Sequence, residues 1–292
     1  MFKKKMETFK KDLEEKGYCI IPNILSNDEI EEAKTLFYDW QKTIPNHDKF
    51  HSLINPHGIY KFHQIGHQEH AWFIRTRPQI INVFKYLWKC EDLTVSFDGS
   101  NYIPQNCTKK DRTWTHTDQA PNKKGVHCYQ GLVSLTDNKE RTLVVYEGSH
   151  KQHSSYFEDR DIRGNNDWFI FDTNVIKEME AQKRVLNISK GSLVIWDSRT
   201  FHQNQYGAPN SEERMVQYVC YLPKNGPKNT ITMREKHLKY FYNLRTTSHW
   251  PYPITVVPLQ PQTYGDKSKL IDYTTLRKPD LERFMPDIEK LL

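Results

Sequence analysis

The chain has little cysteine and lacks any long apolar run. Its five cysteines are scattered and odd in number, which predicts reduced thiols rather than a disulfide framework. No run of 18 apolar residues occurs, which argues against a membrane-spanning helix. The first residues enter a charged helical pattern without an apolar signal segment, as a chain that is not exported would. These absences argue against a disulfide-stabilised secreted domain and predict a cytoplasmic location.

The charge of the chain is only mildly positive. We interpret the net charge of +6 at pH 7 as an ordinary solvated surface, although it would also suit an anionic substrate. Apolar residues make up 37% of the chain, and 14 Phe, 16 Tyr and 7 Trp supply bulky core material. The 292 residues suffice for one large domain or two small ones. No nucleic-acid or membrane partner is predicted.

The first 91 residues predict a helical layer. An amphipathic helix at the start ends at Gly17. Ser26 and Glu29 have the spacing of a capping box that opens a second helix, and Pro78 suits the first turn of a third. Between these helices, residues 44–71 lose all periodicity and predict a long surface loop rich in histidine. The histidines lack the tight spacing of metal ligands, so we expect loop or core histidines rather than a second metal site.

From residue 93 the hydrophobic period changes from helical to strand-like. A series of short strands separated by Gly, Pro and Asn is typical of a sandwich or jelly roll. The predicted strands span residues 93–97, 114–118, 126–135, 142–146, 185–188, 193–196 and 214–222. A charged insertion at 154–184 predicts a lid or binding loop. Residues 225–292 predict an extension that packs on the core, because they are too short and too rich in proline for a separate domain.

The stretch Trp-Thr-His-Thr-Asp-Gln from Trp114 contains the strongest candidate site. His116 and Asp118 are two residues apart, and residues i and i+2 of a strand point to one face. His202, after the run Gly-Ser-Leu-Val-Ile-Trp-Asp, is the best third ligand. Two imidazoles and one carboxylate on one side of an octahedron form the facial triad of non-haem Fe(II) oxygenases. From the residues alone, three unrelated polar side chains near strand ends remain an alternative.

Arg214 offers a binding group for a co-substrate. It opens the alternating run 214–222 after a turn-rich loop. If His202 and Arg214 lie on adjacent antiparallel strands, the guanidinium lies one layer deeper in the cavity of the metal. A buried arginine favours a carboxylate that it can hold with two charge-assisted hydrogen bonds, and a 2-oxo diacid would bind both the metal and Arg214. The alternative is a surface ion pair with Glu212 or Glu213.

The chain resembles the phytanoyl-CoA dioxygenase family in the order of its motifs. These are the H-x-D motif, the run Gly148-Ser-His-Lys151, the distal His202 and Arg214. The opening from Phe9 to Ser26 is also similar, so the resemblance extends from about residue 9 to about residue 222. It implies one catalytic domain over 1–292, mainly β with flanking helices. The implied core at 92–224 is a double-stranded β-helix, a cupin-like jelly roll.

The resemblance also implies the chemistry. His116, Asp118 and His202 would hold Fe(II), and Arg214 would bind 2-oxoglutarate. O2 would be the second co-substrate, and a small-molecule or acyl-type substrate would be oxidised with release of succinate and CO2. Halogenating relatives replace the carboxylate ligand with a small residue, so Asp118 favours hydroxylation or desaturation.

Further polar residues are candidates for the same cavity. Asn204 stands where the family often has a serine that assists the same carboxylate, and an amide can donate a similar hydrogen bond. Tyr129, Gln130 and Asn101 lie on predicted strands that should line the cavity, with plain strand residues as the alternative. Gln119, beside the triad, could contact substrate or co-substrate.

Other conspicuous residues favour structural roles. Gly148 suits a turn and His150 a hydrogen bond to the backbone. Trp114 and Trp196 are expected in the core, as is Cys128, which has no basic motif beside it to activate a thiolate.

Two other classes of protein stay open. Two histidines and a carboxylate also suit a zinc-dependent hydrolase, although a hydrolase has no general need for Arg214. The same scaffold could also serve as a non-catalytic binding module. The identity of the substrate and the oligomeric state do not follow from the sequence.

Overall fold

The chain alternates between two structural units, and the computed structural model describes residues 2–45, 47 and 54–292. The first unit comprises Met1–Pro22 and Pro104–Arg214, and the second comprises Asn23–Ile103 and Met215–Leu292. Both contain antiparallel strands and flanking helices, as predicted. No helix in the described ranges is long and apolar enough to cross a bilayer. All five cysteines are free thiols.

The first unit begins with helix α1 (Phe2–Lys16) and strand β1 (Tyr18–Ile21). Gly17 between them has φ +89°, a backbone conformation that glycine adopts without penalty. A Cβ at this position would also stand 2.6 Å from His150 Nδ1 and 2.7 Å from Thr200 Oγ1. Strand β1 pairs with β10 (Leu193–Asp197), which pairs with β6 (Tyr129–Ser134).

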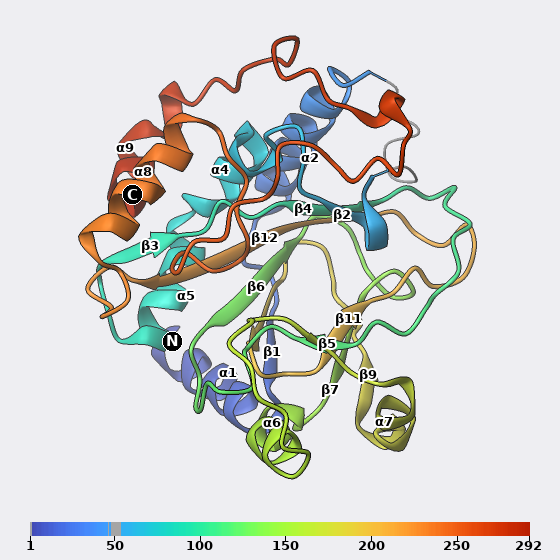
Figure 1. The fold of residues 1–292 in the computed structure, drawn as a ribbon. Helices are drawn as coiled ribbons and strands as arrows, with labels where there is room; N and C mark the ends of the chain where they lie inside the picture. The colour runs from blue at the N-terminus through green and yellow to red at the C-terminus, as the bar shows by residue number, and fades with distance from the viewer. Residues whose placement is uncertain (1, 46, 48–53) are drawn as a thin grey trace. The chain divides into compact units, whose positions relative to one another are not determined.

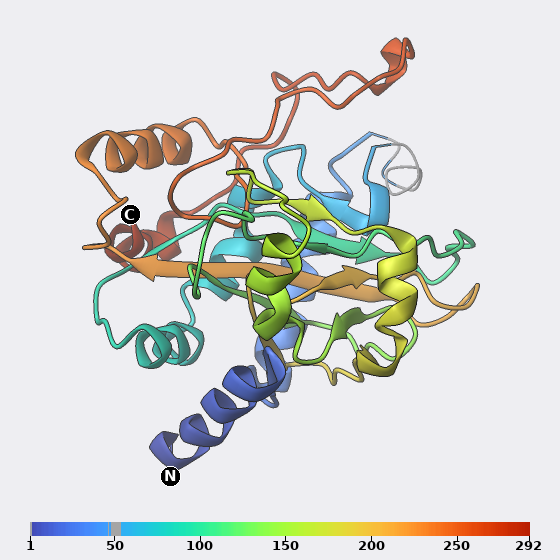
Figure 2. The same ribbon diagram turned by 60° about the horizontal axis from the view of Figure 1, so that its bottom comes forward.

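The other sheet of this unit has five strands (Figure 1). In spatial order they are β8 (Phe169–Ile170), β5 (His116–Thr117), β11 (His202–Asn204), β7 (Leu143–Tyr146) and β9 (Lys183–Val185). Helices α6 (Ser149–Glu158) and α7 (Thr173–Glu178) lie in front of these strands in Figure 2. The turn η3 (Glu180–Gln182) follows α7.

An aromatic cluster fills the space between this sheet and its helices. Its members come from β7, α6, α7 and the connecting segments, and all are buried. They are Val144, Tyr146, Phe157, Phe171, Ile176, Met179 and Phe201. The predicted insertion 154–184 is therefore part of this packed layer, because Phe169 and Phe171 anchor it to the sheet.

The second unit contains most of the remaining helices. The capping box at Ser26 is present as predicted and opens α2 (Asn27–Gln41). Helices α4 (Glu69–Arg75), α5 (Pro78–Trp88), α8 (Ile231–Tyr242) and α9 (Met285–Leu291) follow, with short 3-10 turns at Pro56–Gly58, Ile65–His67, Lys267–Lys269 and Glu282–Phe284. Strand β12 (Arg214–Pro223) pairs with β3 (Leu93–Val95) and β4 (Ser100–Ile103), and β4 pairs with β2 (Ile59–Tyr60).

The prediction of a surface loop at residues 44–71 is wrong for the residues of this segment that the structure describes. His63, His67 and His70 are buried, and the segment contains β2 and the start of α4. His67 Nε2 lies 3.0 Å from the Arg245 carbonyl. Burial lowers the pKa of His67 and of His70 to about 3, because the charged ring would lose its hydration. These histidines are core residues, which hydrophobic periodicity cannot reveal because histidine reads as polar. Residues 46 and 48–53 of this segment lie outside the described residues.

Candidate metal centre

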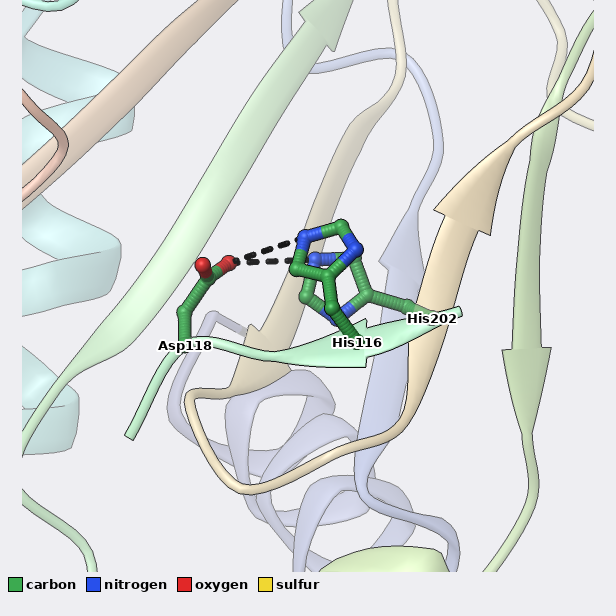
Figure 3. A group of neighbouring side chains, drawn as sticks. All are labelled: His116, Asp118 and His202. Carbon is green, nitrogen blue, oxygen red and sulfur yellow. Dashed lines mark ion pairs between the residues drawn. The ribbon is translucent and has the colours of Figure 1, made fainter. Parts of the chain in front are cut away.

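His116, Asp118 and His202 meet in the first unit and form one compact group. Asp118 Oδ2 lies 3.6 Å from His116 Nε2 and 3.2 Å from His202 Nε2. The three ligand atoms lie within 4.8 Å of one another. Figure 3 shows both imidazole rings turned toward the carboxylate. All three residues are buried, with at most 6% of their surface exposed.

Strand pairing brings the two histidines together although 86 positions separate them in the sequence. β5 and β11 are antiparallel neighbours in which His116 is directly opposite His202, so the two side chains share a face of the sheet. The Asp118 amide donates to the Ser198 carbonyl at 3.1 Å, and Thr117 Oγ1 donates to the same oxygen. The H-x-D strand is thereby fixed to the loop that leads to His202.

Backbone carbonyls orient both imidazole rings. His116 Nδ1 lies 3.1 Å from the Trp114 carbonyl, and His202 Nδ1 lies 2.9 Å from the Thr200 carbonyl. A carbonyl only accepts, so each Nδ1 donates to its carbonyl, and in the neutral ring this leaves the lone pair on Nε2. This is the arrangement in which a histidine binds a metal through Nε2 while its other nitrogen is held by a hydrogen bond.

Gln130 orients the Asp118 carboxylate. Its Nε2 donates to Asp118 Oδ2 at 2.9 Å, and both residues are buried. The sequence indicated that Gln130 faces the cavity, but not that it contacts a ligand residue. No feature of the sequence identifies this contact, because Asp118 follows β5 whereas Gln130 belongs to β6, a strand of a different sheet.

The donor set fits a divalent transition metal. Ligands bound at about 2.1 Å and at right angles stand about 3 Å apart, close to the two separations from Asp118 Oδ2. A metal cation held by these three side chains would compensate the buried charge of Asp118. Within the described part of the chain, this is the one group of three or more His, Cys, Asp or Glu side chains arranged to hold a metal.

Arg214 is fully buried at the start of β12. The alternative of a surface ion pair is therefore wrong, and Glu212 Oε1 instead accepts from three backbone amides, at residues 139–141. The predicted adjacency of the His202 and Arg214 strands is also wrong. β11 lies between β5 and β7 in the five-stranded sheet, whereas β12 belongs to the seven-stranded sheet. The loop after Asn204 therefore crosses from one sheet to the other.

The other candidate residues have different surroundings. Asn204 is buried and, two residues after His202, shares its face of β11. Tyr129 precedes Gln130 and points to the opposite face of β6, where burial and the charges of Asp197 and Glu14 raise its pKa to about 12. The structure thus does not bring Tyr129 to the triad.

Asn101 belongs to the second unit, where its Nδ2 donates to the His57 carbonyl at 2.8 Å. Gln119 has a structural role. Its Nε2 donates to the carbonyls of Lys123 and Gly125, and its Oε1 accepts from the His127 amide and Ser198 Oγ.

Most of the residues predicted to have structural roles do have such contacts. Gly148 has φ +80° before α6, and His150 Nε2 lies 3.0 Å from the Glu14 carbonyl. Trp196 is buried with its ring 5.4 Å from that of His202. Trp114 differs, because its half-buried ring stacks on His116 at 4.7 Å and so flanks the metal centre.

Comparison with known proteins identifies the family. Residues 13–206 match the model of the phytanoyl-CoA dioxygenase (PhyH) family. The chain is 28% identical over 218 residues to "Ava biosynthesis cluster protein O" of Aspergillus versicolor, covering 69% of each chain.

Solved structures support the fold. HygX from Streptomyces hygroscopicus, crystallised with nickel and 2-oxoglutarate, has a TM-score of 0.53 at 11% identity over 75% of this chain and 87% of its own. The α-ketoglutarate-dependent carbocyclase SnoK from nogalamycin biosynthesis has a TM-score of 0.52 at 20% identity, over 74% and 83%. At these identities the likeness shows the fold alone. The family match covers most of the chain and includes His116, Asp118 and His202. The chain therefore belongs to the phytanoyl-CoA dioxygenase family and is an Fe(II)- and 2-oxoglutarate-dependent oxygenase that uses O2.

Proposed function

We propose that this oxygenase hydroxylates or desaturates a small organic molecule at a carbon–hydrogen bond, with release of succinate and CO2. The observation that carries the proposal is the buried group of His116, Asp118 and His202, with both Nε2 atoms turned to one carboxylate. We further propose that the two units act as one catalytic domain built on a jelly-roll core, and that the enzyme, with its five free thiols, works in the cytoplasm.

The three ligands would occupy one side of the iron and leave three positions for co-substrate and O2. The bound metal supplies one-electron and O2 chemistry, with 2-oxoglutarate as the source of the remaining electrons. The role of the chain is to hold that centre in a fixed orientation. Gln130 fixes the carboxylate, and the carbonyls of Trp114 and Thr200 hold the Nδ1 atoms and so orient the two rings.

Arg214 is the proposed partner of the distal carboxylate of 2-oxoglutarate. A fully buried guanidinium is stabilised by an anion that accepts two parallel hydrogen bonds. Asn204, on the same face of β11 as His202, is the proposed second donor to this co-substrate. Gln130 already donates to Asp118, so its role toward the co-substrate is indirect. We leave Tyr129 and Asn101 out of the proposed site, since Tyr129 faces away from Asp118 and the Asn101 amide bonds to the backbone at His57.

Two considerations narrow the reaction and its substrate. Asp118 occupies the position that halogenating relatives leave for halide, which favours hydroxylation or desaturation. The Aspergillus relative is named for a biosynthesis cluster, so we propose a biosynthetic small molecule as the substrate rather than a macromolecule.

The test is anaerobic reconstitution with Fe(II) followed by titration with 2-oxoglutarate. We expect a visible metal-to-ligand charge-transfer band, because 2-oxoglutarate bound to Fe(II) absorbs in this way. His116→Ala and Asp118→Ala should both abolish it. His150→Ala is the matched control, since His150 is a buried histidine that contacts a backbone carbonyl instead of the triad.

Arg214→Ala tests the co-substrate site separately, because it removes the guanidinium. Loss of one partner of a buried charge pair costs about 2–5 kcal/mol, so the 2-oxoglutarate requirement should rise roughly 30-fold or more while iron stays bound. An unchanged requirement would show that Arg214 is not the anchor. Tight zinc binding without a charge-transfer band would favour the hydrolase, and absence of any metal binding would leave a binding module.

A further inference from the structure

Strand β8 carries apolar side chains on both faces, although one of these faces is open to solvent. Phe169 and Phe171 pack into the aromatic cluster, but Trp168 and Ile170 are each 46% exposed. A strand at a sheet edge with one open face ordinarily carries polar residues there. Two large apolar residues on such a face indicate a contact with another molecule.

The register of the sheet places this open face beside the metal centre. β5 and β8 are antiparallel, with His116 opposite Ile170 and Thr117 opposite Phe169. Directly opposed residues share a face, so Ile170 is on the face of His116, and Trp168, two residues away, is on it too. The rings of Trp168 and His116 are 6.0 Å apart.

We propose that Trp168 and Ile170, the apolar wall, contact the substrate and select one that presents a planar ring. This inference rests on the proposed function, because it takes the molecule beside His116 to be the one that is oxidised. Trp168 offers a flat, polarisable surface that favours stacking with another ring, and Ile170 extends it with aliphatic surface. A strongly polar substrate would lose hydration at this wall without gaining hydrogen bonds from it.

The wall is held rigidly from both sides. Asp167 Oδ1 accepts from the Ala120 amide at 3.0 Å, and the Asp167 carboxylate forms an ion pair with Lys123. On the other side, the Phe171 amide donates to the Thr115 carbonyl at 2.9 Å. The residue before Trp168 is thus tied to the loop that follows Asp118. Asp167 is a positioning residue, since it acts through Trp168.

Strand addition by a second copy of the chain is the main competing use of this edge. It is disfavoured because β8 has only two residues, too few for a stable strand pairing. Measuring the oligomeric state in solution tests this alternative directly. A dimer that Ile170→Ser converts to a monomer would overturn the proposal.

The binding test uses protein labelled with 5-fluorotryptophan and loaded with Zn(II) and 2-oxoglutarate, so that no turnover occurs. The chain has seven tryptophans, and Trp168→Phe assigns the Trp168 resonance in the fluorine spectrum. We expect indole to shift this resonance saturably and glucose to leave it unmoved. In calorimetric titrations with indole, which do not depend on the Trp168 resonance, Ile170→Ser should weaken indole binding severalfold and Trp168→Ala about tenfold.

Ile231→Ser is the matched control, because Ile231 is an exposed isoleucine of α8 in the second unit. It should leave the indole affinity unchanged. A Trp168 resonance that indole does not move, or an indole affinity that Trp168→Ala leaves within twofold, would overturn the proposal.

A second measurement separates this proposal from the proposed function. The charge-transfer band should survive in Trp168→Ala, since the wall contributes no metal ligand. Absence of the charge-transfer band in the unsubstituted protein would refute the proposed function itself. With the band present, ring-containing compounds should stimulate succinate release, and Trp168→Ala should raise their KM more than it lowers kcat, with Trp168→Phe restoring most of the affinity. Stimulation by polar aliphatic compounds alone would refute the wall while leaving the oxygenase intact.

Discussion

Replacing Gln130 with leucine would test how the chain orients its carboxylate ligand. The Gln130 amide donates to Asp118 Oδ2 at 2.9 Å, and this oxygen is the one nearest both imidazoles. Leucine keeps most of the side-chain volume and removes the donor. The carboxylate then loses the group that holds its rotamer, and its charge faces a buried apolar side chain.

The magnitude follows from the type of hydrogen bond. A hydrogen bond to a charged group contributes about 1.5–3 kcal/mol, which corresponds to roughly 10- to 150-fold in an equilibrium constant. Part of this is lost in the metal-free protein too, so the effect on metal binding lies toward the lower end. We expect Gln130→Leu to weaken metal binding about tenfold, within the range usual for residues that orient metal ligands.

Calorimetric titration with Mn(II) in saturating 2-oxoglutarate measures this affinity without turnover. Gln217→Leu is the matched control, since Gln217 is also a buried strand glutamine, but its partners are Ser100 and the carbonyls of Gly99 and Tyr218. It should lower stability and leave the metal affinity unchanged. A Gln130→Leu protein that binds Mn(II) as tightly as the parent would refute the orienting role.

Three further predictions concern the site and its support. His202→Ala should abolish the charge-transfer band while the far-ultraviolet circular dichroism stays unchanged; a retained band would remove His202 from the ligands. Gly17→Ala should lower the free energy of unfolding by about 2–5 kcal/mol in urea titrations, because it combines a left-handed backbone with close contacts to His150 and Thr200. Gly125→Ala, with φ +72° and no atom near its Cβ, should cost only about 1–2 kcal/mol; equal losses would refute the steric argument. Burial holds the pKa of His67 at about 3, below the value near 6.5 of the unfolded chain. The folded state therefore resists protonation, stability is complete above pH 6.5, and about 2 kcal/mol is lost between pH 7 and pH 5. His67→Gln should reduce this loss, and an identical pH profile would contradict it.

The grouping of His116, Asp118 and His202 was predictable because residue type and spacing both indicate it. Imidazole and carboxylate are ligands that transition metals bind, and the two-residue spacing in H-x-D predicts a shared face where the chain is extended. His202 followed from its place after an apolar strand. The helices opened by Ser26 and Pro78 were equally readable, because capping depends on local hydrogen bonds and backbone angles.

The predictions that were wrong concern features that depend on contacts between distant segments. Residues 54–71 read as a loop because histidine counts as polar in any periodicity, yet His67 and His70 satisfy a ring nitrogen inside the core. The adjacency of β11 and β12 failed because a loop of nine residues, 205–213, can return to the same sheet or cross to the other one. The sequence contains no signal that separates these outcomes.

The register between β5 and β8 shows why the apolar wall also could not be predicted. The run Trp168-Phe-Ile-Phe171 is apolar throughout, so alternation does not reveal which pair faces the metal. A shift of one residue would exchange the faces, placing Phe169 and Phe171 beside His116 and sending Trp168 and Ile170 into the aromatic cluster. The observed register is favoured because Phe171 packs on Phe201, with the two rings only 3.8 Å apart, and Phe169 packs on Phe157. The larger indole ring would not fit there without displacing its neighbours. Packing on the far face of the sheet therefore decides which side chains lie beside His116 on the near face.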